Sequence, residues 1–339
     1  MKVNKRLKAV LKIIIPLLLG IFILFLLYGK MDLKSIADIA RHGVNYWIIA
    51  LSLLFGAGAN IIRGLRWQIL INTVTEGNKA KKANSILTTL GSYTVNMALP
   101  RAGEFWRCAE MGRYEQISFS KLLGTLFIDR ITDILMLGLI FLGIFLGAGS
   151  FFSEFFTKNP DITSNFYAIL GSIWLYVGIV TFGIMLWMIY KYLIKRKPDH
   201  KVSMMFMKVG EGLKSIWKMD QKWLFIIYSI AIWVGYFLFF YTTFYAFDFT
   251  QTLGVEVGLI AFALSSMAVI VPVQGGVGPW HFLVISALVA FSVNKEDAGA
   301  FALIVHTIQT LWITLVGLIS IFLLPLINKN YIRSQNERE

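Results

Sequence analysis

Cysteine is almost absent from this chain of 339 residues, which has only Cys108. A single cysteine excludes an intramolecular disulfide and any metal site built from a cluster of cysteines. Histidine is also scarce, and the four histidines lack the HExxH spacing of a metal site. No ATP-binding motif occurs. We therefore expect no metal, no cofactor and no catalytic residue, and a protein that is not an enzyme.

Charged residues are also few, at 15% of the chain against 57% hydrophobic residues. A soluble domain has about 25% charged residues. Apolar runs of eighteen residues or more recur, and a helix of that length spans a bilayer core of about 30 Å. The alternating pattern of an outer-membrane barrel is missing. The sequence predicts an all-α, polytopic membrane protein.

The formal net charge of +13 arises largely from basic residues in loops beside the apolar runs. This placement is typical of the positive-inside rule for cytoplasmic loops, so we expect no nucleic-acid partner. Lys2, Lys5, Arg6 and Lys8 precede the run 10–28, which is too long for a signal peptide and lacks its cleavage site. The run is interpreted as a retained first span with a cytoplasmic N-terminus.

Six full spans are predicted, and loop charges set their direction. The spans are 10–29, 46–62, 122–148, 166–190, 223–247 and 298–324. The loops 63–82 and 191–222 are strongly basic and therefore cytoplasmic, whereas 150–164 is external. Segment 83–99 then starts and ends on the cytoplasmic side. It is predicted to form one limb of a re-entrant hairpin, 83–115, in the inner membrane.

A second interruption lies between the apolar segments 255–271 and 277–291. It predicts an external hairpin, 255–291, although two full crossings would give the same parity. With that hairpin, 46–149 and 223–324 become halves of an inverted repeat within one membrane domain, 1–339, whose termini are both cytoplasmic. Segment 30–45 is predicted to hold a surface helix. Segment 191–222 is predicted to be an amphipathic cytoplasmic helix, or else a solvated linker.

The first interruption carries charged residues in a membrane-like sequence. Such residues are costly near a bilayer interior and usually face a partner or a solute path. Arg101 and Arg107 suit an anionic headgroup because guanidinium binds phosphate through two parallel donors. Alternatively, they neutralise Glu104 and Glu110. The candidate headgroup residues here are Asn96, Arg101, Glu104 and Arg107, and the turn residues are Pro100 and Gly103.

Asp129, Arg130 and Asp133 lie inside the span that begins near Lys121. At 1.5 Å per residue, the two aspartates lie about 12 and 18 Å along a helix and share a face. Arg101, Arg107 and Glu104 are the expected partners, in a headgroup site or in buried ion pairs that hold the hairpin. At the cytoplasmic end of a span, residues such as Arg63, Arg66 and Trp67 more often snorkel to lipid headgroups than form a binding site. They nevertheless lie on the same side of the membrane as the opening of the first hairpin. Arg63 and Arg66 are therefore also candidate headgroup residues.

The second interruption is rich in glycine. Gly275, Gly276 and Gly278 permit a positive φ, and with Pro272 they predict a sharp turn. The run lacks the lysine of a P-loop, so it is a weak phosphate signal. His281 and His306 are expected to be hydrogen-bonded structural groups, with proton coupling as the alternative.

These motifs together resemble the lysylphosphatidylglycerol synthase transmembrane region, a flippase-like family. The resemblance rests on Asn96-xxx-Pro100-Arg101-x-Gly103-Glu104-xx-Arg107, Asp129-Arg130-xx-Asp133, Pro272-xx-Gly275-Gly276-x-Gly278 and the upstream Arg63-xx-Arg66-Trp67. It covers nearly the whole chain. Gln274 and His281 stand where family members often carry a proline and an acidic residue, which weakens an acid-dependent role for the second hairpin.

The resemblance implies movement of a lipid between leaflets, with an anionic or modified phospholipid as partner. Full-length synthases add a soluble aminoacyl-transferase domain, which we expect to be absent because only residues 325–339 follow the last span. Two alternatives stay open. The chain is an enzyme for a polyprenyl- or phospholipid-linked substrate, or a membrane subunit of a separate lipid-modifying synthase. The sequence predicts neither the lipid nor the oligomeric state.

Overall fold

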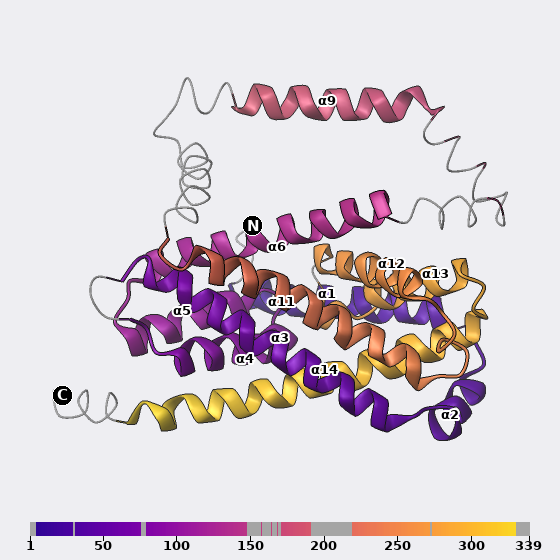
Figure 1. Cartoon of the computed structure of the whole chain (residues 1–339), viewed down its shortest axis with the longest axis horizontal. Helices are drawn as coiled ribbons and strands as arrows, with labels where there is room; N and C mark the ends of the chain where they lie inside the picture. Colours follow the sequence, from indigo (N-terminus) through magenta and orange to yellow (C-terminus); the bar gives the residue numbers. More distant parts are fainter. Residues whose placement is uncertain are drawn as a thin grey trace. The chain divides into compact units, whose positions relative to one another are not determined.

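The structure is a computed structural model that describes residues 5–29, 31–75, 79–147, 171–190, 219–271 and 273–329, and the single positions 157, 164 and 168. Every regular element in these ranges is helical, which confirms the all-α prediction for them (Figure 1). The chain divides into two compact units, one of Met1–Phe141 with Trp223–Glu339 and one of Leu142–Lys222. Within the second unit the structure describes α9 (Ile173–Tyr190). The predicted helix or linker at 191–222 lies outside the described residues up to position 218, as does Pro272.

The first unit begins with α1 (Lys5–Tyr28), the short α2 (Leu33–His42) and α3 (Tyr46–Asn72). The side chains of Asp32 and Asn45 accept hydrogen bonds from backbone N–H groups in the first turns of α2 and α3, respectively. The prediction that the second span ends at residue 62 is wrong, because α3 continues for ten more residues. Arg63 and Arg66 therefore lie inside a helix, where carboxylates of α6 pair with their charges.

Helices α4 (Lys82–Ala98) and α5 (Ala102–Glu115) form an antiparallel pair joined by a three-residue turn. Asn84 donates to Glu115 at one end of the pair (Nδ2 to Oε1, 2.5 Å), and the Gly103 N–H donates to Asn96 Oδ1 at the other (2.7 Å). Arg101 ends the turn with a φ of 63°. Both outer ends of the pair thus lie together, as a hairpin requires. Gly103 lies within α5 instead of the turn, and its missing side chain lets the backbone approach the Ser92 carbonyl.

The remaining helices of the first unit are α6 (Phe119–Gly147, which runs on into the second unit), α11 (Lys222–Tyr241), α12 (Val255–Ser266), α13 (Pro279–Ala290) and α14 (Lys295–Ile327). Short 3₁₀ turns, η2 (Thr242–Ala246), η3 (Met267–Ile270) and η4 (Gln274–Gly276), follow α11 and connect α12 to α13. Gly275, Gly276 and Gly278 have φ values of 58°, 74° and 91°. Only glycine adopts such angles without strain, so the chain reverses here and α13 packs against α12 (Figure 1).

The tips of the two helix pairs meet beside the middle of α14. Met97, at the end of α4, packs on Gly275, whose carbonyl accepts from His306 Nε2 at 2.9 Å. Thr94 donates to the Thr314 carbonyl at 2.8 Å. His306 and Thr314 lie about 16 Å from the N-terminal end and about 20 Å from the C-terminal end of α14, respectively, at 1.5 Å per residue. Helix α4 starts beside Asn328, just past the C-terminal end of α14, whereas α13 is joined to the N-terminal end of α14 by a short loop. The two pairs therefore approach this level from opposite ends of α14.

Four helices in the described part of the chain are long and apolar enough to cross a membrane. They are Tyr46–Asn72, Phe119–Gly147, Lys222–Ala246 and Lys295–Ile327. Leu17–Tyr28, Tyr176–Met185 and Val255–Ile270 form shorter apolar helices. The protein is a multi-pass membrane protein, whereas the count of six spans and the re-entrant course of the two pairs stay predictions.

Candidate functional site

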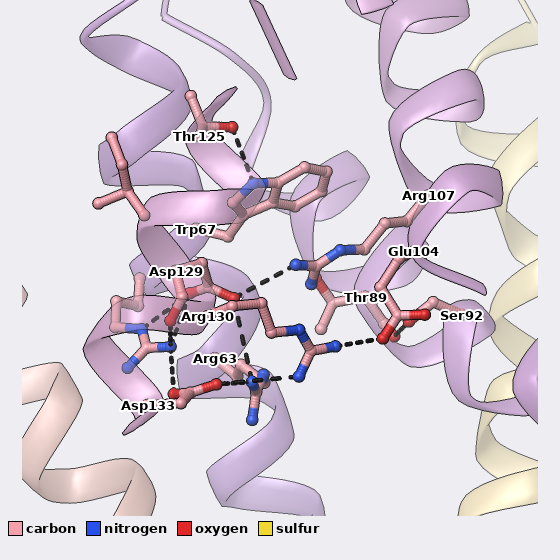
Figure 2. Close-up of polar contacts among 12 residues, drawn as sticks. Arg63, Trp67, Thr89, Ser92, Glu104, Arg107, Thr125, Asp129, Arg130 and Asp133 are labelled. Atoms are coloured by element: carbon pink, nitrogen blue, oxygen red, sulfur yellow. Dashed lines mark hydrogen bonds and ion pairs between the residues drawn. The ribbon is translucent and has the colours of Figure 1, made fainter. Parts of the chain in front are cut away.

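Seven charged side chains from three helices form one cluster in the first unit (Figure 2). They are Arg63 and Arg66 of α3, Glu104 and Arg107 of α5, and Asp129, Arg130 and Asp133 of α6. We call this set the arginine cluster. Four arginines face three carboxylates, so the cluster carries one excess positive charge when all its groups are ionised.

Asp129 lies at the centre of the arginine cluster and is fully buried. Its Oδ1 accepts from Arg66 Nε at 3.0 Å and from Arg66 Nη2 at 2.6 Å, and its Oδ2 accepts from Arg107 Nη2 at 3.2 Å. Arg66 and Arg107 are themselves 0% and 1% exposed. A buried carboxylate is stable only when paired and hydrogen-bonded, so these two arginines hold Asp129 in its charged form.

Trp67 supports the buried side of the arginine cluster. Its indole Nε1 donates to Thr125 Oγ1 at 3.1 Å, and the Arg107 guanidinium carbon lies 4.4 Å from the centre of its ring system. The cation–π contact is a second source of stabilisation for a guanidinium that has left water. Trp67 was expected to snorkel with Arg63 and Arg66, but it is completely buried and packs within the cluster.

The other side of the arginine cluster is partly open. Asp133 accepts from Arg63 through Oδ2 and from Arg66 Nη2 through Oδ1 at 2.7 Å. Arg130 Nη2 donates to Glu104 Oε1 at 2.5 Å. The side chain of Arg130 is 41% exposed and that of Glu104 is 21% exposed. Of the four arginines in the cluster, Arg130 is therefore the one that an approaching ligand can readily reach.

The expected snorkelling of Arg63 and Arg66 is not what the structure shows, because both are buried and ion-paired. Arg101, expected as a partner of the aspartates, is exposed at the turn and has no ion pair among the described residues. Asn96 caps the first turn of α5. Arg107 and Glu104 do reach the α6 charges.

Several polar partners of the arginine cluster were not found from the sequence. Arg63 Nη1 donates to Tyr236 Oη at 3.3 Å, and Arg66 Nη1 donates to Ser229 Oγ at 3.4 Å. Tyr236 in turn donates to Asn60 Oδ1 at 2.7 Å. Ser229 and Tyr236 are seven residues apart in a largely apolar helix, which places them on one face. That spacing was the signal available in the sequence.

His281 and His306 lie together at the second interruption, outside the arginine cluster. Their ring centroids are 4.5 Å apart, and both side chains are buried. His281 Nδ1 accepts from the Gly278 N–H at 3.4 Å, while His306 donates to the Gly275 carbonyl. Each histidine thus bonds to the backbone of the glycine-rich turn.

A surface pocket of about 410 Å³ lies elsewhere, at the adjoining ends of α3, α5 and α6. Its lining is Val74, Thr75, Glu115, Gln116, Ile117, Ser118 and Lys121. None of these is a candidate site residue, so the pocket and the arginine cluster are separate features.

The helices and the internal charged cluster define a polytopic helical membrane protein with paired charges between its helices. Residues 13–317 match the family described as "Lysylphosphatidylglycerol synthase TM region", and the chain belongs to this family. The resemblance predicted from the motifs is thereby confirmed. No curated protein and no solved structure matches the chain.

Proposed function

We propose that this protein moves a lipid with an anionic or otherwise modified headgroup between the leaflets of the cytoplasmic membrane. The observation that carries the proposal is the excess arginine of the cluster, together with the exposure of Arg130. A guanidinium binds phosphate through parallel donors, and an incompletely neutralised cluster attracts an anion. Membership of a lipid-synthase transmembrane family supports a lipid substrate.

The depth of the arginine cluster supports a role in crossing the membrane. Counted from the ends Asn72, Glu115 and Phe119, the cluster residues lie about 9–21 Å along α3, α5 and α6 at 1.5 Å per residue. These three ends are cytoplasmic in the predicted topology. The cluster would then lie within the bilayer, where a headgroup has left water and fixed charges act through a low dielectric constant.

The two helix pairs would form the path on either side of this site. In the proposed arrangement α4 and α5 enter from the cytoplasm, α12 and α13 enter from outside, and their tips meet at Met97 and Gly275. Acyl chains would stay in the bilayer while the headgroup passes the tips. Both termini would be cytoplasmic.

Transport in reconstituted vesicles tests the proposal, with acyl-labelled fluorescent phospholipids and a quencher that reaches only the outer leaflet. Arg130→Gln is expected to slow translocation at least tenfold, because it removes the accessible guanidinium. Arg113→Gln is the matched control, since Arg113 is an exposed arginine near the end of α5, outside the cluster, and pairs with Glu110. Equal translocation rates in both variants and the unaltered protein would show that Arg130 is not part of the transport site.

The family description also favours a second function, that of a membrane subunit for a separate lipid-modifying synthase. Affinity purification in mild detergent followed by mass spectrometry distinguishes the two. A stoichiometric partner enzyme together with no lipid transport in vesicles would favour the subunit. Formation of a modified lipid by the purified chain alone would favour the enzyme alternative.

A further inference from the structure

Three buried polar atoms at or near the arginine cluster have no hydrogen-bond partner among the residues that the structure describes. They are Thr89 Oγ1 on α4, and Glu104 Oε2 and Arg107 Nε on α5. The residues Thr89 and Arg107 are 0% and 1% exposed. Figure 2 labels Thr89, Glu104 and Arg107 together with the arginine cluster, and a dashed line joins the Glu104 carboxylate to Arg130. Most buried polar groups in proteins are paired, so these three atoms require a partner, either a ligand group or ordered water.

The three atoms require a partner of mixed hydrogen-bonding character. Arg107 Nε can only donate, an ionised Glu104 oxygen can only accept, and the Thr89 hydroxyl does both. A phosphodiester group by itself accepts but does not donate, and a quaternary ammonium group does neither. A phosphodiester with a hydroxyl or an N–H-bearing ammonium group beside it satisfies both ends.

The ion pair between Arg130 and Glu104, on the exposed side of the cluster, also suits a partner that both accepts and donates hydrogen bonds. Glu104 uses only Oε1 for Arg130 and leaves Oε2 unpaired. A headgroup phosphate bound by Arg130 would place its neighbouring donor next to Glu104 Oε2. The pair thus presents a cation for the phosphate and an acceptor for the group attached to it.

We propose that Glu104 selects lipids whose headgroup carries a hydrogen-bond donor next to its phosphate. The donor is a hydroxyl, as in phosphatidylglycerol, or an ammonium N–H, as in phosphatidylethanolamine. This inference rests on the proposed function for its lipid substrate, but it concerns binding and is tested by binding. Ordered water at the three atoms is the competing occupant.

The decisive experiment measures binding of short-chain phospholipids to the purified full-length chain in detergent. Phosphatidylethanolamine, its N,N-dimethyl derivative and phosphatidylcholine all carry a phosphate and a cationic nitrogen. Only the last lacks an N–H. Affinity is expected to fall about tenfold at the final methylation, the size of one hydrogen bond to a charged group, and phosphatidylglycerol is expected to bind like the N–H-bearing lipids. Attraction by charge alone would give no step there.

Glu104→Gln is the matched variant, and it is expected to reduce the tenfold preference to about twofold or less. Glu110→Gln, on the same helix and outside the cluster, is expected to keep the preference. Melting temperature and helical circular dichroism check that both variants fold. A flat methylation series in the unaltered protein overturns the inference whatever the variants do, and indicates that water alone fills the position.

The binding series and the vesicle assay fail independently. A step in binding without transport would overturn the proposed function and keep Glu104 as the selecting residue. Transport of all headgroups at one rate, with no step in binding, would keep the function and overturn the selection.

Discussion

Asp129 is the residue on which the arginine cluster depends, because it receives hydrogen bonds from two buried arginines and lies 4.0 Å from a third, Arg63. Removing one member of a buried ion pair leaves an uncompensated charge, at a cost of about 3–5 kcal/mol. Asp129→Ala is therefore expected to lower the melting temperature in detergent strongly. Glu110→Gln affects a partly exposed pair with Arg113, so it is expected to change stability by less than about 1 kcal/mol.

A double variant tests whether Asp129 and Arg66 act as a structural ion pair. Asp129→Leu combined with Arg66→Met replaces an ion pair by apolar groups, which often restores stability that either single change loses. The double variant is expected to melt above both single variants. If it melts below them, the pair does not act as a unit, and the structural account of Asp129 is wrong.

Close contacts between helices decide where α3 tolerates a side chain, and its glycines make a matched test. A Cβ on Gly64 would lie 2.6 Å from the Ile86 Cα of α4, whereas a Cβ on Gly58 would meet nothing within 4 Å. Forcing two helices apart costs about 1–3 kcal/mol, while glycine to alanine in a helix gains up to about 1 kcal/mol.

Gly64→Ala is therefore expected to lower the melting temperature, and Gly58→Ala to leave it unchanged or raise it slightly. Thermal unfolding followed by circular dichroism in one detergent checks both variants. An equal effect of the two substitutions would show that α3 and α4 are not in the close contact described here.

His306 links α14 to the glycine-rich turn through its bond to the Gly275 carbonyl. Since a carbonyl only accepts, Nε2 carries the proton, and Nδ1 is free to accept from Thr310 Oγ1 at 3.4 Å. A structural role needs only a donor at this place. His306→Gln is expected to retain stability and lipid transport, whereas His306→Leu is expected to lower both.

The pH profile of transport separates the two roles of His306. Glutamine donates but does not titrate near neutral pH, so a profile unchanged in His306→Gln supports the structural role. Loss of pH dependence in a stable His306→Gln variant would instead establish proton coupling and overturn our expectation.

Hydropathy and loop charge were enough to predict the helices to within a few residues in most cases, as with α4 at 82–98 against the predicted limb 83–99. They failed at α3, where Arg63 and Arg66 look like the polar end of a span. Whether an arginine ends a helix or continues inside it depends on a carboxylate from a distant segment. The exposure of Arg101 likewise depends on a turn whose backbone angles no composition rule gives.

At the scale of the first unit, hydrogen bonds at its two ends agree with one topology. Asn45 N–H donates to the Ala246 carbonyl at 2.9 Å, and Tyr28 donates to the Gly299 carbonyl at 3.0 Å, all at predicted external ends. Asn328 Nδ2 donates to Asn84 Oδ1 at 2.7 Å, where both residues are at predicted cytoplasmic ends.

Single-cysteine labelling tests this topology directly, because the chain has only one cysteine to remove, the buried Cys108. In a Cys108→Ala background, Lys82→Cys and Ser120→Cys flank the first helix pair, while Gln251→Cys and Lys295→Cys flank the second. All four positions are exposed. If both pairs are re-entrant, a membrane-impermeant maleimide added to intact cells is expected to label the second two and not the first two.

Comparing the labelling of the two cysteines that flank one helix pair is more informative than the labelling of any single position. The fourteen residues of α5 are about 21 Å long, and α12 with η3 is about 26 Å long. Both lengths fall short of a core of about 30 Å. Each pair should therefore return to the side it entered from. Opposite labelling of Lys82→Cys and Ser120→Cys would make α4 with α5 a crossing unit, invert every later span, and place the arginine cluster on a path with a different direction.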